Sequence, residues 1–300
     1  MELIRELRAN IRMLPSRDIT ERSPAEDIWA KVVNRLRYLI IHEDPRKFLE
    51  WANLSTMFVG SEAYVAEELR YLQQHRQWSG KWREAIVESV VGRPTRFLAY
   101  PQSSGNLIHH AYHLSQFEEK TGRQVADLDF LVEFGGGYGS MCRLIHKLGF
   151  NGKYIIFDLA EFSCLQSFFL KSMDLPVHSL ESFTSTGSGI LMISDRDVLR
   201  DVISNCFEQS LNSLFIATWS ISETSIPFRE EILGLVMPFD AFLIAYQDKF
   251  GEVDNVEFFS NLKRKSEDIN WQSWEIQHIP GSRYLVGEKT GRIFQRRFQK

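Results

Sequence analysis

The feature that most narrows the fold of this chain is a glycine-rich segment between an apolar run and a helical stretch. The run LVEF at 131–134 is followed directly by GGGYG at 135–139, and helical spacing continues through 140–148. Glycine is needed where the backbone turns with positive φ, or where a ligand must approach main-chain atoms closely. A buried strand, a glycine turn and a helix in this order predict a nucleotide-type binding unit.

Short apolar runs alternate with helical stretches through the second part of the chain. They occur at 128–134, 154–157, 213–219 and 241–246, and this pattern is typical of buried parallel strands. Pro280 and Gly281 separate two later runs, 274–279 and 282–289, which predicts an antiparallel hairpin. We therefore expect an α/β fold with a Rossmann-like, seven-stranded, mostly parallel sheet that ends in a C-terminal antiparallel hairpin.

The part of the chain before the glycine turn has a different pattern. Apolar residues recur there at helical spacing, interrupted by a turn-rich segment at 100–106. We expect residues 1–120 to form an all-helical region that caps the binding site or makes a dimer surface. Residues 121–300 would then form the cofactor-binding domain.

Composition excludes several classes of protein. The chain has 300 residues, 44% of them hydrophobic, and a formal net charge of −4, which excludes disorder. Three widely spaced cysteines indicate a reduced protein, and charges within the first residues exclude a signal peptide. No apolar run reaches the roughly 18 residues of a membrane span. We expect a cytoplasmic protein without a nucleic-acid partner, because phosphate binding needs a basic face.

The spacing of the glycines shows which of the known glycine-rich binding patterns this sequence fits. The dinucleotide pattern G-x-G-x-x-G would place Ser140 at its third small position, and no Gly-Lys-Ser/Thr follows as a P-loop requires. The pattern E-x-G-x-G-x-G fits throughout, with Glu133 as its acid. An NAD-dependent oxidoreductase stays open as an alternative.

This pattern is similar to the first motif of class I S-adenosylmethionine-dependent methyltransferases. The resemblance implies S-adenosylmethionine as cofactor, with Gly135 and Gly137 contacting its methionine part and Glu133 near its ammonium group. Gly139, the last glycine of the motif, is a further predicted cofactor-binding residue. Asp158 ends the next strand, 25 residues after Glu133, and an acid there can accept both ribose hydroxyls. A methyltransferase fold without catalysis, serving as a binding partner, is the second alternative.

Three stretches together resemble the putative sugar O-methyltransferases. They are 133–170, 214–223 and 278–289, and Ala160 departs from the Pro expected after Asp-Leu. The resemblance implies methylation of a hydroxyl of a sugar or glycosylated small molecule, and hence a carbohydrate-type acceptor.

Transfer of a methyl group to a hydroxyl needs one base that takes the proton. Glu223 follows the run at 213–219, so it should lie at the carboxyl end of a strand beside the cofactor. His278 lies on the expected hairpin, and a histidine titrates near neutral pH. These two residues are the predicted catalytic groups.

Four further residues are predicted to contact the acceptor. His109 and His113 share one helical face, and Tyr246 and Asp248 follow the run at 241–246. The i, i+4 histidines could ligate a metal, but no third ligand is evident and H-E-x-x-H is not formed. No metal is expected.

Overall fold

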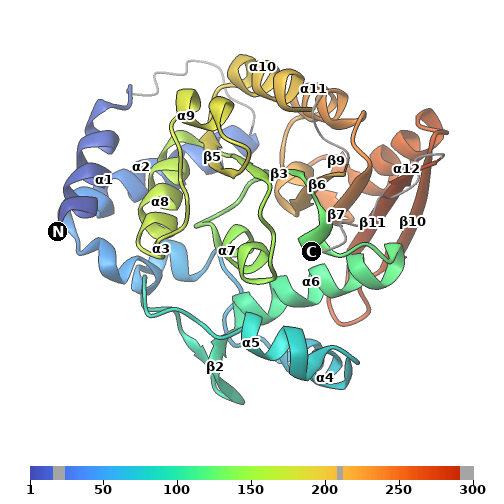
Figure 1. Cartoon of the computed structure of the whole chain (residues 1–300), viewed down its shortest axis with the longest axis horizontal. Helices are drawn as coiled ribbons and strands as arrows, with labels where there is room; N and C mark the ends of the chain where they lie inside the picture. The colour runs from blue at the N-terminus through green and yellow to red at the C-terminus, as the bar shows by residue number, and fades with distance from the viewer. Residues whose placement is uncertain (16–23, 208–211, 291–300) are drawn as a thin grey trace.

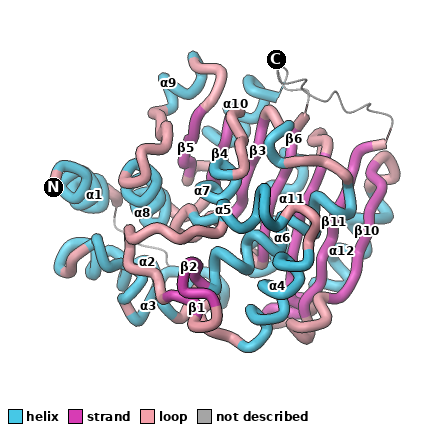
Figure 2. The backbone as a smooth tube through the Cα atoms, turned by 60° about the horizontal axis from the view of Figure 1, so that its bottom comes forward, coloured by secondary structure: helices cyan, strands magenta, loops and turns pink. Residues whose placement is uncertain are grey.

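A seven-stranded sheet organises the molecule. The computed structural model describes residues 1–15, 24–207 and 212–290. The strands lie in the order β10-β11-β7-β6-β3-β4-β5, seen side by side in Figure 2. Only β11 runs against its neighbours β7 and β10, and the other neighbouring pairs are parallel. The strands are β3 (Phe130–Phe134), β4 (Lys153–Phe157), β5 (Gly189–Ile193), β6 (Ser213–Thr218), β7 (Ala241–Gln247), β10 (Ile269–Glu275) and β11 (Ser282–Lys289).

Helices cover both faces of this sheet because its strands are apolar on both sides. On one face, residues 130, 132 and 134 of β3 pack against the helices α9 (Leu180–Ser185), α10 (Arg196–Phe207), α11 (Ile226–Val236) and α12 (Asn255–Lys265). On the other face Leu131 packs in a core that includes α6 (Gly105–Thr121), α7 (Ser140–Lys147) and α8 (Ala160–Lys171). The sheet is therefore the middle layer of three, as the alternating runs predict.

The N-terminal part of the chain packs on the second face, against the helices that cover the sheet. Its helices are α1 (Glu2–Met13), α2 (Pro24–His42), α3 (Ala52–Ser55), α4 (Ala63–Gln74) and α5 (Arg83–Ala85), with short helical turns at Pro45–Glu50 and Trp78–Trp82. Figure 1 shows α1 and α2 beside α8, and α4 and α5 beside α6. The buried residues of these helices belong to the same hydrophobic cluster as Leu131.

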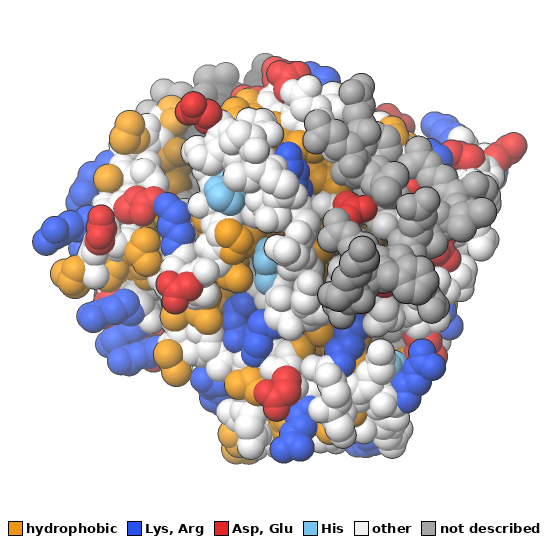
Figure 3. Space-filling view, viewed as in Figure 1, with side chains coloured by type: hydrophobic (Ala, Val, Ile, Leu, Met, Phe, Trp, Pro, Cys, Tyr) orange, Lys and Arg blue, Asp and Glu red, His pale blue; other side chains and the backbone are white. Residues whose placement is uncertain are grey.

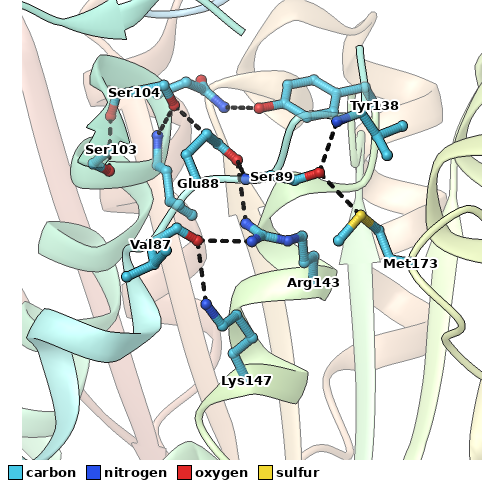
Figure 4. A network of polar contacts seen from close by, with 12 residues as sticks. Val87, Glu88, Ser89, Ser103, Ser104, Tyr138, Arg143, Lys147 and Met173 are labelled. Carbon is cyan, nitrogen blue, oxygen red and sulfur yellow. Dashed lines mark hydrogen bonds and ion pairs between the residues drawn. The ribbon is translucent and has the colours of Figure 1, made fainter. Parts of the chain in front are cut away.

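A buried ion pair ties this region to the helix that follows the glycine turn. Glu88 and Arg143 approach to 3.3 Å, with 3% and 6% of their side chains exposed. Arg143 also donates to the carbonyl oxygen of Val87 at 2.8 Å, and Ser104 donates to Glu88 (Figure 4). The helical region is thus held on α7 by charge as well as by apolar packing.

The predicted fold is confirmed, with four local differences. The turn-rich segment at 100–106 contains β2 (Tyr100–Ser104), which pairs with β1 (Arg96–Phe97) in a hairpin. The first arm of the C-terminal hairpin is Ile269–Glu275, upstream of the predicted 274–279, and β5 coincides with no predicted run. A smaller hairpin joins β8 (Lys249–Phe250) and β9 (Val253–Asp254). The boundary after residue 120, the dimer and the cytoplasmic location stay predictions.

The surface adds two observations. In the described part of the chain, no helix is both long and apolar enough to cross a membrane. Figure 3 shows acidic and basic side chains interspersed over the part of this face that is not grey. Surface charge on this face therefore identifies no ligand.

Candidate cofactor and acceptor site

A cavity of about 910 Å³ opens at the carboxyl ends of β3, β4 and β6. Parallel α/β sheets bind ligands at this end of their strands. The sheet side of its wall includes the glycine turn, Asp158 and Glu223. The helical region supplies much of the remaining wall, namely Trp29, Phe58, Tyr64, Asn106, His109 and His110. Both parts of the chain therefore build one site.

The glycine turn needs its glycines for two reasons. Gly135 and Gly137 have φ of +74° and +57°, a region that favours glycine. A Cβ on Gly135 would lie 2.3 Å from Cβ of Ser220, and a Cβ on Gly137 would lie 2.8 Å from the Phe58 ring. Both glycines line the cavity. Gly139, with φ of +95°, begins α7 and faces Leu170, so it shapes the turn from behind the cavity.

Glu133 is a buried acid near the end of β3. Only 4% of the residue is exposed, and the Tyr154 hydroxyl donates a hydrogen bond to its Oε2 at 2.8 Å. Burial raises the pKa of Glu133 to about 8, although the Tyr154 bond acts in the opposite direction. It forms no ion pair with a described residue. A cationic ligand group placed beside it would favour the ionised carboxylate.

Asp158 follows the neighbouring strand β4 and is held by the glycine turn. Its Oδ2 accepts from the Gly137 amide at 3.2 Å and from Nε2 of Gln166 at 2.8 Å, and its Oδ1 accepts from the Leu159 amide at 2.7 Å. Burial outweighs these bonds and raises the pKa of Asp158 to about 7. Two acids at adjacent strand ends and an open glycine turn fit the ammonium and ribose groups of S-adenosylmethionine.

Glu223 lines the cavity from the turn that follows β6. It ends the short helical turn Ser220–Glu223, which follows Trp219, a residue with φ of +63°. Burial raises the pKa of Glu223 to about 7, against a hydrogen bond from Gln247. A carboxyl group that titrates near neutral pH can accept a proton under working conditions.

A fully buried arginine holds this turn. Nη2 of Arg229 donates to the carbonyl oxygens of Ser222 and Thr224, which flank Glu223, at 2.9 Å each. Its Nη1 donates to Asn255 at 2.7 Å. Burial lowers the pKa of Arg229 to about 10. Its position indicates that Arg229 fixes the backbone on both sides of Glu223.

We expect Arg229→Met to destabilise the chain, because two buried carbonyl oxygens lose their donor. The loss should be about 1–3 kcal/mol in the free energy of unfolding, measured by urea denaturation. Arg264→Met, at an exposed position in α12, serves as control and should change stability by less than about 0.5 kcal/mol. Equal stability of the two variants would show that Arg229 does not hold the turn.

Three of the predicted residues meet around an acid that the sequence analysis missed. Glu68 of α4 is fully buried, and its Oε1 contacts Nδ1 of His109 at 2.7 Å and Nε2 of His278 at 2.9 Å. Nε2 of His113 lies 2.9 Å from Nε2 of His109. We call Glu68, His109, His113 and His278 the histidine cluster. Of these four only His109 lines the cavity, so the structure places His113 and His278 behind it.

Tyr246 and Asp248 lie away from this site. The Tyr246 ring packs on Phe259 at 4.3 Å between centroids, and Asp248 accepts from Arg283 at 2.8 Å. Neither residue is part of the cavity wall. Tyr246 belongs to β7 and Asp248 follows it directly, but the chain there turns into the β8–β9 hairpin, so a position at the end of a strand did not place them in the site.

The described residues contain no group of three or more His, Cys, Asp or Glu side chains that could hold a metal ion. The histidine cluster is explained by hydrogen bonds among its own members. Nδ1–H of His109 and Nε2–H of His278 both donate to Glu68, so no ion is needed between these groups.

Comparisons with solved structures list several methyltransferases to which this chain is similar. No protein-family model and no curated protein matches the sequence. An O-methyltransferase family protein from Burkholderia thailandensis is 8% identical, with 75% of this chain and 68% of that chain covered and a TM-score of 0.41. An rRNA methylase from Streptococcus thermophilus is 13% identical, covering 55% and 91%, with a TM-score of 0.39. The N-terminal domain of human METTL16, in complex with SAH, is 8% identical, covering 61% and 70%, with a TM-score of 0.40.

These likenesses correct one expectation. The exclusion of a nucleic-acid partner, made from the mild net charge, is wrong, because the solved structures to which this chain is similar include an rRNA methylase. A net charge of −4 does not remove nucleic acid from the acceptors open to such a chain. Identities and scores this low assign no acceptor, and they do not confirm the likeness to the sugar O-methyltransferases.

Proposed function

We propose that this chain is an S-adenosylmethionine-dependent O-methyltransferase. One observation carries the proposal: a buried acid, Glu133, and a half-buried acid, Asp158, lie at the ends of adjacent strands and line one cavity together with the glycine turn. Burial raises the pKa values of both acids towards neutral pH. A ligand that brings a cation and hydroxyl donors therefore stabilises their ionised forms. When bound, S-adenosylmethionine supplies an activated methyl group.

In this proposal the residues of the sheet bind and orient the cofactor. Glu133 pairs with its ammonium group, the backbone at Gly135 and Gly137 accepts close approach, and Asp158 accepts from its ribose. Tyr154 and Gln166 keep the two carboxyl groups in place by the hydrogen bonds described above. The contribution to rate is mainly alignment of the reacting atoms.

The acceptor side of the cavity is formed by Glu223 and the helical region. A cavity of about 910 Å³ is large for one small ligand, since single-ligand sites span roughly 300–1,000 Å³. We propose that Glu223 hydrogen-bonds the acceptor and can act as an acid–base group. A hydroxyl of a sugar or glycosylated molecule is the narrower proposal, and it rests on the resemblance of the three sequence stretches alone.

The cofactor proposal is tested by thermal shift with S-adenosylhomocysteine. We expect saturating ligand to raise the melting temperature of the wild-type chain and of Glu181→Gln, an exposed acid used as control. Glu133→Gln should lose most of the shift. A folded wild-type chain that shows no shift would contradict the proposal.

The shift should also depend on pH. The folded-state pKa of Glu133, about 8, lies above its ordinary value of 4.5, so burial of this acid favours folding at low pH and opposes it as pH rises. The ligand ammonium favours the ionised form, so binding should strengthen between about pH 6 and about pH 8.5. Glu133→Gln should show a flatter dependence, and an equally steep rise in this variant would remove Glu133 from the ammonium contact.

The acceptor class is tested by transfer of a radiolabelled methyl group. The wild-type chain is offered glycosides and total RNA in separate reactions. Label in glycosides supports the narrower proposal. Label in RNA alone contradicts the narrower proposal but supports methyl transfer. Cofactor binding with no label in either sample favours a non-catalytic binding partner.

A further inference from the structure

The proposed function leaves the histidine cluster without a role, although it is the densest buried group of titratable side chains beside the cavity. Its members come from α4, α6 and the turn between β10 and β11. No single segment of the sequence contains the cluster. Such groupings beside a cavity are where acid–base residues are found in enzymes.

His109 is the member of the histidine cluster that lines the cavity. Its ring stacks on Trp219 at 5.3 Å between centroids with 30° between the planes. Trp219 directly precedes the turn that carries Glu223, and its backbone has positive φ. The helical region therefore meets the sheet end at a fixed contact between these two rings.

Glu68 orients the His109 ring. Burial alone would raise the pKa of Glu68, but hydrogen bonds from His109 and His278 outweigh burial and lower it. An ionised Glu68 requires the proton of neutral His109 to be on Nδ1, since that atom contacts the carboxylate at 2.7 Å. Nε2 of His109 then carries a lone pair.

The cluster has consistent hydrogen bonds with and without one added proton. In the neutral state His113 donates from Nε2 to Nε2 of His109, and the Tyr284 hydroxyl donates to Nδ1 of His113. After one proton is added, His109 donates from both nitrogens, to Glu68 and to His113, and His113 donates from Nδ1 to the Tyr284 oxygen. In the chain without an acceptor, no contact of the cluster is lost between the two states.

We propose that His109 is the general base of the acceptor site and that Glu68 is its positioning residue. The inference rests on the proposed function and leaves to Glu223 the hydrogen bond that holds the acceptor. An acceptor hydroxyl displaces His113 from Nε2 of His109. As the oxygen–methyl bond forms, the hydroxyl proton passes to Nε2, the methyl–sulfur bond breaks, and its electron pair stays on sulfur. The resulting imidazolium is paired with the Glu68 carboxylate.

The groups around His109 agree with this assignment. Burial lowers the pKa of His113 well below its ordinary value and that of His110 to about 3, so neither competes for the proton. Burial also raises the pKa of Tyr64, which keeps its hydroxyl neutral. The titratable side chains that face His109 or complete its network are Glu68, Tyr64, His110, His113, His278 and Tyr284.

The first test follows the proton itself in the full-length chain. Histidine-selective NMR of the wild type, across about pH 5 to about pH 9, should show His109 protonated at Nδ1 when neutral and gaining a second proton on acidification. In Glu68→Gln the same ring should gain that proton at a pH at least about one unit lower. A His109 ring that stays neutral throughout, or an unchanged titration in Glu68→Gln, would overturn the proposal.

The second test measures the reaction. The acceptor is the one that takes label in the assay above, or phenol as a slow acceptor if neither glycosides nor RNA are labelled. With this acceptor, His109→Gln should lower kcat about 100-fold. His109→Gln should leave the thermal shift with S-adenosylhomocysteine unchanged. In the wild type, kcat should fall at low pH as the base takes up a proton. Glu223→Gln should mainly raise KM and should keep this fall of kcat at low pH. A wild-type kcat in His109→Gln would overturn the inference. So would a Glu223→Gln variant, and no other, whose kcat no longer falls at low pH. A failed thermal shift in the wild type would instead contradict the proposed function.

Discussion

Gly135→Ala is expected to abolish stabilisation by S-adenosylhomocysteine. The new Cβ would lie 2.3 Å from Cβ of Ser220, a distance at which the backbone must shift. The displaced partner belongs to the turn that carries Glu223, so both walls of the cavity move. The alanine must also adopt φ of +74°, which costs about 1–2 kcal/mol. We expect affinity for the ligand to fall more than about 100-fold, or about 2.7 kcal/mol, in a calorimetric titration.

Gly122→Ala is the matched control for this variant. Gly122 ends α6 with φ of +71°, and a Cβ there would meet nothing within 4 Å. It therefore carries the same backbone cost without the collision. We expect similar loss of stability from the backbone and full ligand affinity. If Gly135→Ala bound S-adenosylhomocysteine as tightly as Gly122→Ala, the glycine turn would not be the cofactor site.

Arg143→Met is expected to destabilise the whole chain by about 3–5 kcal/mol. The substitution leaves the carboxylate of Glu88 buried without its cation, and it removes the donor to the Val87 carbonyl oxygen. Because Glu88 belongs to the helical region and Arg143 to α7, the loss should appear in the single unfolding transition. Urea denaturation followed by circular dichroism measures it.

Two further variants separate charge from packing. Arg46→Met breaks an exposed pair with Asp44, and we expect less than about 1 kcal/mol of destabilisation. The double variant Arg143→Met with Glu88→Met removes both charges and should recover much of the lost stability, since a buried pair can be replaced by apolar groups. A double variant no more stable than Arg143→Met would show that the stranded carboxylate is not the cause.

The strands that position the site could be predicted because burial on both faces produces apolar runs. The run at 128–134 contains Phe130–Phe134, and that at 213–219 contains Ser213–Thr218. β5 was missed because its apolar run GILMI is short and lies beside a Ser/Thr/Gly-rich stretch. The first hairpin arm was misplaced because β10 alternates buried, half-buried and exposed residues, which weakens its apolar signal.

The site was predictable only where local sequence determines it. The glycine turn and Asp158 belong to one strand-turn-helix-strand unit, in which the turn follows the first strand and Asp158 follows the second. Their spacing in the sequence therefore indicated a shared site. Glu68 could not be found, because it lies in an ordinary helical pattern and meets His278 across 210 residues. The role proposed for His109 depends on its own contact with Glu68, so it too required the structure.

We propose that the cavity binds S-adenosylmethionine through the glycine turn and its two acids. Isothermal titration calorimetry of the full-length chain at about pH 8, with S-adenosylhomocysteine and separately with NADH, tests it most directly. We predict one S-adenosylhomocysteine bound per chain and no heat of binding for NADH. Binding of NADH, or no binding of S-adenosylhomocysteine to a folded chain, would contradict the claim.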